Sequence, residues 1–240
     1  MTTKLSFDGD WRATVTDDPL HITPRFTGDS VDLARYADVS ERERLLTDTF
    51  GSQHWLWDTP DVFRFAPDSR KLVGAELQLP YVYAAAETST RLPVMPAVRR
   101  GGLRADEVKD FRHEMCTVLC RTPGDAVLTC LRDLDVLDEP LDARIGIAPD
   151  VALLVQHGTV VGWSLTDPAR YLTTSFAAPD PAPPSRPPAA CSPNAWTWSP
   201  RRWSTTWSTV NRPPWPASRP PTRPCASNAR TGTGPTPCSS

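Results

Sequence analysis

The chain has 240 residues, with 26 Lys and Arg against 28 Asp and Glu, which gives a formal net charge of −2 at pH 7. This length leaves room for one large or two small domains. No apolar run approaches the ~18 residues that a membrane-spanning helix needs. Polar residues such as Lys4 and Asp8 interrupt the start of the chain where a signal segment would lie. We therefore expect a cytoplasmic protein without a membrane anchor.

The first element that the sequence predicts is a helix over residues 41–50. Ser40 and Glu43 have the spacing of a capping box, and Gly51 supplies a C-terminal stop. A β-hairpin should follow, because apolar runs at 62–65 and 71–79 flank the turn-forming residues 67–70.

A proline-rich connection then leads to a basic stretch that contains a Gly-Gly pair. Arg99, Arg100 and Arg104 lie there, ahead of a short helix predicted over residues 105–111. Backbone N–H groups at a helix start bind phosphate well, so Arg99 and Arg100 are candidate ligand-binding residues. No strand and glycine-loop fingerprint precedes them, and an ordinary basic loop is the alternative.

Two further hairpins are predicted in the second half of the chain. One joins residues 115–120 to 126–131, and the other joins 151–156 to 160–165 across a turn at His157 and Gly158. Asp167 and Pro168 are a good N-cap and first helical residue, which predicts a helix over 168–176. Residues 1–180 should therefore form an α+β domain, with an antiparallel sheet built from consecutive hairpins and with flanking helices.

Two groups of residues are candidates for catalysis. Ser164 lies in a Gly-Trp-Ser-Leu-Thr string that approaches the G-x-S-x-G nucleophile motif without its last glycine, and His157 is the nearest histidine. The alternative is a serine within a strand. The second group is an acidic cluster that could bind a divalent cation, or could be a solvated connection; it consists of Asp133, Asp135, Asp138, Glu139 and Asp142.

Cysteines and histidine between residues 113 and 130 raise the possibility of zinc. His113, Cys116 and Cys120 would share one face of a helix, with Cys130 as a fourth ligand. The segment has a strand pattern, however, and in a strand these side chains diverge. We expect three unlinked, buried thiols and no metal or cofactor.

Aromatic residues near position 55 suggest a binding surface. Trp55 and Trp57 share one face of a predicted strand beside His54, an arrangement that could stack a planar ligand or pack in a core. The leading hypothesis is a non-catalytic cytoplasmic binding or protein-interaction domain that binds another protein rather than nucleic acid. The alternative is a hydrolase-like enzyme that uses Ser164 and His157, or a metal-dependent enzyme that uses the acidic cluster.

Residues 181–240 differ in composition from the rest of the chain. Sixteen of the 27 prolines follow Ala177, and the seven charged residues after Asp180 are all Arg. This segment lacks Leu, Ile, Phe and Tyr, so it cannot offset the ~1–2 kcal/mol per residue that backbone ordering costs. The sequence predicts a disordered tail.

A reading-frame change explains this composition. Trp has the single codon TGG, so shifting the frame back by one base places its final G before the first two bases of the next codon. Trp196-Thr197 then reads GAC, an Asp codon, and Trp198-Ser199 reads GTC, a Val codon, if Ser199 is encoded by TCN. With G or C in third positions, residues 195–216 decode to approximately R-L-D-L-V-A-A-P-V-V-D-D-L-V-D-G-E-P-A-A-L-A. Apolar and acidic residues alternate in this string as in helical surface segments. We therefore expect that the tail is a frameshifted reading, and that residues 1–180 are an incomplete domain.

Overall fold

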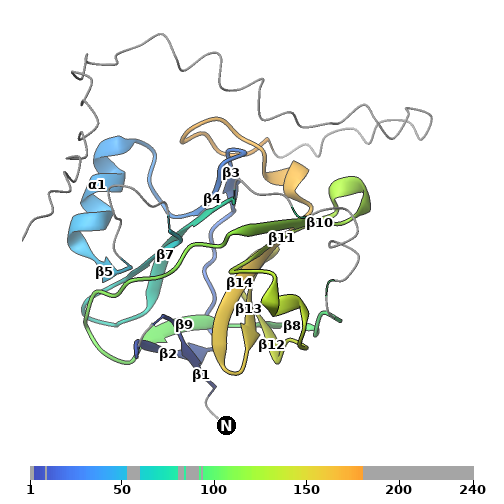
Figure 1. The fold of residues 1–240 in the computed structure, drawn as a ribbon. Coiled ribbons are helices and arrows are strands. Elements are labelled where there is room, and N and C mark those ends of the chain that lie inside the picture. Colours follow the sequence, from blue (N-terminus) through green and yellow to red (C-terminus); the bar gives the residue numbers. More distant parts are fainter. Residues whose placement is uncertain are drawn as a thin grey trace, which may run out of the picture. The chain divides into compact units, whose positions relative to one another are not determined.

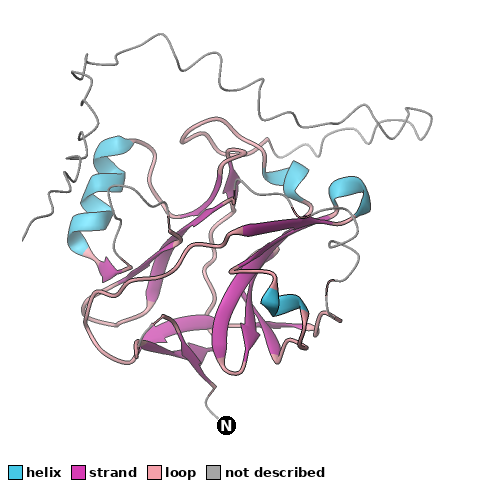
Figure 2. Ribbon diagram, viewed as in Figure 1, coloured by secondary structure: helices cyan, strands magenta, loops and turns pink. Residues whose placement is uncertain are grey.

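The computed structural model describes residues 3–8, 10–52, 60–80, 84, 92 and 94–180. They belong to one compact unit, Met1–Arg186, whereas the tail predicted to be disordered lies outside the described residues. Strands in two sheets dominate the described part, which contains a single α-helix (Figure 2). The expectation of an α+β fold with flanking helices is therefore wrong, because two of the three expected helices are absent and strands dominate the described residues.

The larger sheet has nine strands (Figure 1). Seven follow one another through hydrogen-bonded pairing in the order β8 (Val98–Arg100), β12 (Ala143–Ala148), β13 (Val151–Gln156), β14 (Thr159–Thr166), β1 (Lys4–Ser6), β2 (Arg12–Thr16) and β9 (Gly102–Ala105). The remaining two, β10 (Val118–Arg121) and β11 (Val127–Leu131), join through the pairing of β11 with β14. Two pairs are parallel, β1 with β14 and β8 with β12, so the sheet is not made only of hairpins.

This sheet closes on itself. Strands β8 and β9 are separated by Gly101 alone, yet β8 pairs with β12 and β9 pairs with β2. The two ends of the seven-strand path are thus consecutive in the chain. β8 and β9 do not pair with each other, so the two ends are joined through the chain at Gly101.

The smaller sheet has five strands, in the order β3 (Arg25–Phe26), β4 (Ser30–Leu33), β7 (Leu72–Gln78), β6 (Val62–Phe65) and β5 (Phe50–Gly51). Non-strand chain extends both of its edges. Leu172 bridges Phe26 beside β3, and Phe111 bridges Ser52 beside β5. Distant parts of the sequence therefore complete this sheet.

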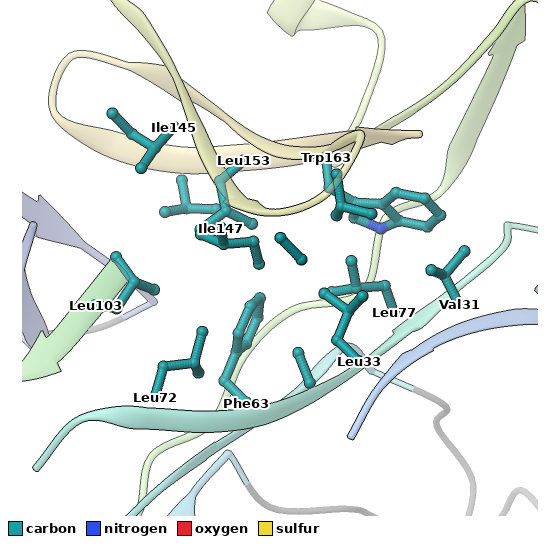
Figure 3. Close-up of a cluster of buried hydrophobic side chains, with 14 of the residues drawn as sticks. Val31, Leu33, Phe63, Leu72, Leu77, Leu103, Ile145, Ile147, Leu153 and Trp163 are labelled. Carbon is teal, nitrogen blue, oxygen red and sulfur yellow. The ribbon is translucent and has the colours of Figure 1, made fainter. Parts of the chain in front are cut away.

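The main core lies between the two sheets (Figure 3). Residues alternate along the smaller sheet, so that Val31 and Leu33 face the core while Asp32 between them lies on the other face. Figure 3 shows side chains from the two sheets pointing toward one another. They are Val31, Leu33, Phe63, Leu72 and Leu77 on one side and Leu103, Ile145, Ile147, Leu153 and Trp163 on the other.

A second apolar cluster lies on the opposite face of the larger sheet. Leu131, Leu154 and Val161 project from its strands, and Val136 and Leu137 cover them from a short 3-10 helix, η2 (Asp135–Leu137). Both faces of this part of the sheet are therefore buried.

The three predicted hairpins are present. Strand β6 pairs with β7, β10 with β11, and β13 with β14, each antiparallel. The turn between β10 and β11 contains the 3-10 helix η1 (Pro123–Asp125). His157 and Gly158 both have positive φ, 52° and 72°, which is the geometry of a tight turn that matches the twist of a hairpin.

The α-helix, α1 (Val39–Asp48), lies close to the predicted position but starts two residues early. Asp38 is its N-cap and accepts a bond from Glu41 N at 2.8 Å, while Glu41 Oε2 accepts one from Ala37 N at 2.8 Å. This arrangement resembles a capping box shifted from the predicted Ser40 and Glu43, except that Glu41 accepts from the residue before the N-cap. The helix packs on the outer face of the smaller sheet, where Leu45 approaches Gly74 of β7.

Two predicted helices are absent. Residues 106–111 are not helical: Phe111 stacks on Trp11 with ring centroids 4.0 Å apart and bridges Ser52. Asp167 has left-handed dihedrals, φ 49° and ψ 53°, instead of the extended conformation of an N-cap, and it makes no side-chain cap. A single 3-10 turn, η3 (Pro168–Tyr171), therefore replaces the helix over 168–176, and Leu172 extends to pair with Phe26.

Candidate functional site

A groove runs between α1 and the connection that joins β2 to β3. It consists of two hollows of about 350 Å³ and 400 Å³, and Arg35 lines both. Glu41 of the first hollow and Leu45 of the second lie four residues apart, on the same side of α1. We call this surface the α1 groove.

The first hollow is built around Arg25. Its side chain is 7% exposed and donates to Tyr36 O at 2.6 Å and to Phe176 O at 3.1 Å. The guanidinium carbon lies 4.5 Å from the centroid of the Tyr36 ring, a cation–π contact. Phe176 packs edge-on against the same ring at 5.6 Å. Arg25 therefore fixes the wall of the hollow and attaches the C-terminal segment to it.

Acidic side chains lie beneath this wall on the outer face of the smaller sheet. Asp32 and Glu76 are direct neighbours on β4 and β7, and Arg42 of α1 binds Glu76 at 2.7 Å. Burial raises the pKa of Asp32, and the neighbouring Glu76 adds to the shift. Burial also raises the pKa of Tyr36, which stays a neutral phenol. The ion pair between Arg42 of α1 and Glu76 of β7 therefore anchors the helix on the sheet.

The second hollow is mainly apolar. Leu20, Ile22, Leu45 and Val73 line it and are only partly buried. Lys71 and Asp18 form an ion pair of 2.8 Å at its rim. An apolar wall with a few polar groups at the rim is typical of a binding site.

Arg35 is a cation of the groove that has no ion pair among the described residues. Lys71 is paired with Asp18, and Glu41 accepts a hydrogen bond from the Ala37 N–H while it keeps its negative charge. Arg35 is exposed and makes no ion pair or hydrogen bond with the other described residues. The groove therefore presents one available guanidinium beside partly exposed apolar side chains.

The structure does not bring Ser164 and His157 together. Ser164 lies in the middle of β14, is 1% exposed, and receives a bond from Arg144 at 3.3 Å. His157 lies in the turn before β14, where its ring contacts Glu139. Strand β14 begins at Thr159, two residues after His157, and at ~3.3 Å per residue Ser164 lies roughly 16 Å along the strand from Thr159. The Ser164 hydroxyl is therefore far beyond hydrogen-bond reach of the His157 ring.

The acidic cluster does not converge on a point. Asp133 accepts bonds from the N–H groups of Asp135 and Val136, at 2.9 and 3.3 Å. Asp142 accepts from Gly158 N at 3.0 Å, and Glu139 contacts His157. These carboxylates cap turns, and the described residues include no group of three side chains placed to hold a metal ion.

The thiols lie on opposite faces of the β10–β11 hairpin. Leu119 pairs with Cys130 and Cys120 pairs with Thr129, so Cys120 faces the second cluster while Cys130 faces the main core. Cys116, Cys120 and Cys130 are buried, and none of them forms a disulfide. Burial raises the pKa of the Cys116 and Cys130 thiols, which opposes formation of the reactive thiolate.

A buried carboxyl group lies beside Cys116. Asp61 is 2% exposed, accepts a bond from Gln78 N at 2.7 Å and lies 3.7 Å from Cys116 Sγ. Burial raises its pKa to about 6. His113 nearby has Nδ1 at 2.7 Å from Asp8 Oδ2, close enough for an ion pair although the two groups lack hydrogen-bond geometry. Burial alone would raise the pKa of Asp8, but His113, the Glu114 N–H and Arg132 together lower it. Neither of the two hollows described above is lined by these residues.

Arg99 and Arg100 lie on β8, which is exposed at every residue. The segment after them is strand β9 instead of a helix, so the helix start expected to help bind phosphate is absent. Ligand binding by Arg99 and Arg100 stays a prediction. His54, Trp55 and Trp57 lie outside the described residues.

Sequence reasoning missed the α1 groove. Its lining comes from five stretches that are far apart in the chain: residues 18–23 with 25, 34–37, 41 with 45, 71–73, and 176 with 178–179. No motif marks Arg35. The one available signal was an arginine immediately before a capped helix, where a positive charge opposes the helix dipole.

Comparison with known proteins gives no relative: no protein-family model, curated protein or solved structure matches this chain. In the described residues, no helix is long and apolar enough to cross a membrane.

Proposed function

We propose that this protein is a non-catalytic binding domain whose α1 groove holds a segment of another protein. The observation that carries the proposal is the meeting of two hollows at Arg35, an exposed cation without a partner among the described residues. A segment with one or more carboxylates and adjacent aliphatic side chains fits this chemistry.

Two features favour a protein partner over nucleic acid. Residues 1–180 contain 19 basic and 28 acidic side chains, a balance that repels a polyphosphate backbone. The groove also offers apolar side chains from Leu20, Ile22 and Leu45, which a phosphate backbone cannot use. Three buried cysteines without a disulfide suit a reducing compartment, so we propose that the interaction occurs in the cytoplasm.

The enzyme hypothesis has less support. The separation of Ser164 from His157 and the turn-capping roles of Asp133 and Asp142 leave neither group arranged as a catalytic site. Binding, by contrast, needs only the surface described above.

Fluorescence anisotropy with two labelled model peptides tests the proposal. One peptide alternates Asp and Leu, and the other alternates Lys and Leu. We expect the full chain to bind the Asp-Leu peptide and not the Lys-Leu peptide. We expect Arg35→Glu to weaken binding about tenfold or more, because it reverses the charge of an exposed guanidinium that has no ion pair among the described residues.

Arg44→Glu is the matched control, since Arg44 is exposed on α1 but does not line the groove. It should bind the Asp-Leu peptide like the unaltered protein. Equal binding of both peptides, or equal losses in the two variants, would overturn the proposal.

A further inference from the structure

We infer that the open edge of strand β8 is a second interaction surface, which takes up an extended, acidic segment of another protein as an added strand. This inference goes beyond the proposed function, because it concerns a different part of the molecule. It also gives a role to Arg99 and Arg100, which do not line the α1 groove.

Strand β8 has one paired side and one open side. It pairs with β12 and ends the hydrogen-bonded order of the larger sheet (Figure 1). Alternate residues of a strand direct their N–H and C=O groups to opposite sides. Gly101 N donates to Gly146 O of β12 at 3.1 Å, so the backbone groups of Val98 and Arg100 point to the open side. Among the described strands, only β12 pairs with β8.

The open edge is accessible to a partner. All three residues of β8 are exposed, and Val98 is 48% exposed. Val98 Cγ1 lies over Gly146, where an added Cβ would approach it to 2.8 Å. Val98 and Arg100 share this face of the sheet with Arg144 of β12, and Arg99 lies on the other face. An exposed edge strand pairs readily with an extended chain.

Three guanidinium groups on β8 and β12 lack an acidic partner. The side chains of Arg99 and Arg100 make no ion pair or hydrogen bond with other described residues. Arg144 donates to Ser164 Oγ at 3.3 Å, but its Nε atom is buried without a hydrogen-bond partner. Burial lowers the pKa of Arg144, and no carboxylate in the described part of the chain offsets that shift. An added strand that carries carboxylates would supply the missing counter-charges.

Charge and backbone chemistry together identify the class of partner. A second copy of this chain would place its own arginines opposite these, and like charges that face one another across strands are destabilising. A nucleic acid cannot extend the backbone ladder of a sheet, and the 19 basic and 28 acidic side chains of residues 1–180 disfavour it. An acidic peptide satisfies both the open backbone groups and the guanidinium groups.

Binding of a labelled peptide that alternates Asp and Thr tests this inference on the full chain. Thr favours strands and lacks the large aliphatic side chain that the second hollow of the α1 groove would accept. Fluorescence anisotropy compares this peptide with a Lys-Thr peptide and with an Asp-Thr peptide that is methylated on its backbone nitrogens. We expect the unmodified Asp-Thr peptide to bind at least about tenfold more tightly than either control, because one control reverses the charge and the other cannot form the ladder.

Variants of β8 separate the backbone from the side chains. Val98→Pro removes an N–H that points to the open edge, a place where strands tolerate proline, and should weaken binding about fivefold or more. Val98→Ala keeps that N–H and should bind within about twofold of the unaltered protein. Arg100→Glu should weaken binding about tenfold or more, whereas Arg44→Glu on α1 should not. The methylated peptide tests the same contact without altering the protein, so the result does not depend on the folding of a variant.

The outcomes are distinct from those for the α1 groove. Arg35→Glu should leave binding of the Asp-Thr peptide unchanged, and its loss in that variant would assign the peptide to the groove. Equal binding by Val98→Pro and Val98→Ala, or equal binding of the methylated peptide, would also overturn the inference. A dimer that Val98→Pro dissociates would identify a second copy as the occupant, and displacement of the peptide by a single-stranded oligonucleotide would identify nucleic acid. Either result would contradict an acidic peptide at β8 and leave the α1 groove untouched.

Discussion

Asp61 shows how a single buried side chain depends on its surroundings. Its carboxyl group accepts a bond from Gln78 N, yet complete burial outweighs that bond and raises its pKa to about 6, from the ordinary value of 3.8. The neutral acid is therefore the form that the folded protein prefers. Because its pKa is higher in the folded state, this residue stabilises the fold fully below about pH 4 and loses that effect as the pH rises through 6.

Asp61→Asn should consequently change the pH dependence of stability. Each pKa unit corresponds to ~1.36 kcal/mol, so the unaltered protein should lose at most about 3 kcal/mol relative to the variant between pH 4 and pH 7.5. Urea denaturation of both proteins across this range measures the difference. Asp48→Asn, at an exposed site on α1, is the control. Parallel stability curves for Asp61→Asn and the unaltered protein would show that Asp61 does not titrate in this range.

Helix α1 depends on contacts at both of its ends. At the start, Asp38 and Glu41 satisfy two backbone N–H groups. At the end, Arg64 of β6 donates to Leu46 O at 2.7 Å and to Thr49 Oγ1 at 2.9 Å, which places a cation at the negative end of the helix. No residue within the helix is fully buried, so these end contacts carry much of its stability.

The position of the N-cap gives a prediction at this scale. Asp38→Ala should destabilise the protein by about 1 kcal/mol, because the bond to Glu41 N is lost. Ser40 is the N-cap that the sequence predicted, but it lies inside the helix. Ser40→Ala should therefore change the free energy of unfolding by only about a few tenths of a kcal/mol. Urea denaturation distinguishes them, and a larger loss for Ser40→Ala than for Asp38→Ala would contradict the observed cap.

The closure of the larger sheet concerns the whole described unit. Strands β8 and β9 pair with different strands, β12 and β2, although Gly101 alone separates them, and the glycines at 101 and 102 permit the close approach of the chain. A Cβ on Gly102 would lie 1.9 Å from Asp18 O, which is backbone and cannot move aside. The close approach of these segments therefore requires glycine at this position.

Gly102→Ala should accordingly destabilise the protein by about 3 kcal/mol or more, at the upper end of the overpacking range. Gly124→Ala is the comparison: no atom lies within 4 Å of its added Cβ, but its φ of 73° is strained for alanine. That strain costs about 1–2 kcal/mol. Thermal unfolding of the two variants measures the difference, and an equal or larger effect at Gly124 would argue against tight closure at Gly102.

The sequence by itself determined the elements that depend on neighbours in the chain. The three hairpins follow from apolar runs on either side of turn residues, as at His157 and Gly158, and a capping pattern located α1 to within two residues. The composition of residues 181–240 likewise distinguished them from the rest of the chain without any structure.

Only the tertiary structure decided the two missing helices and the α1 groove, because these features depend on contacts between residues that are distant in sequence. The segment 105–111 has a helical pattern, but Ala105 belongs to β9, and stacking of Phe111 on Trp11 and its bridge to Ser52 hold residues 106–111 in a non-helical conformation. Asp167 has the composition of an N-cap, yet the pairing of Leu172 with Phe26 directs the chain away from a helix. The α1 groove combines five separate segments around Arg35. Local preferences amount to only a few tenths to about 1 kcal/mol per residue, so packing and edge pairing outweigh them.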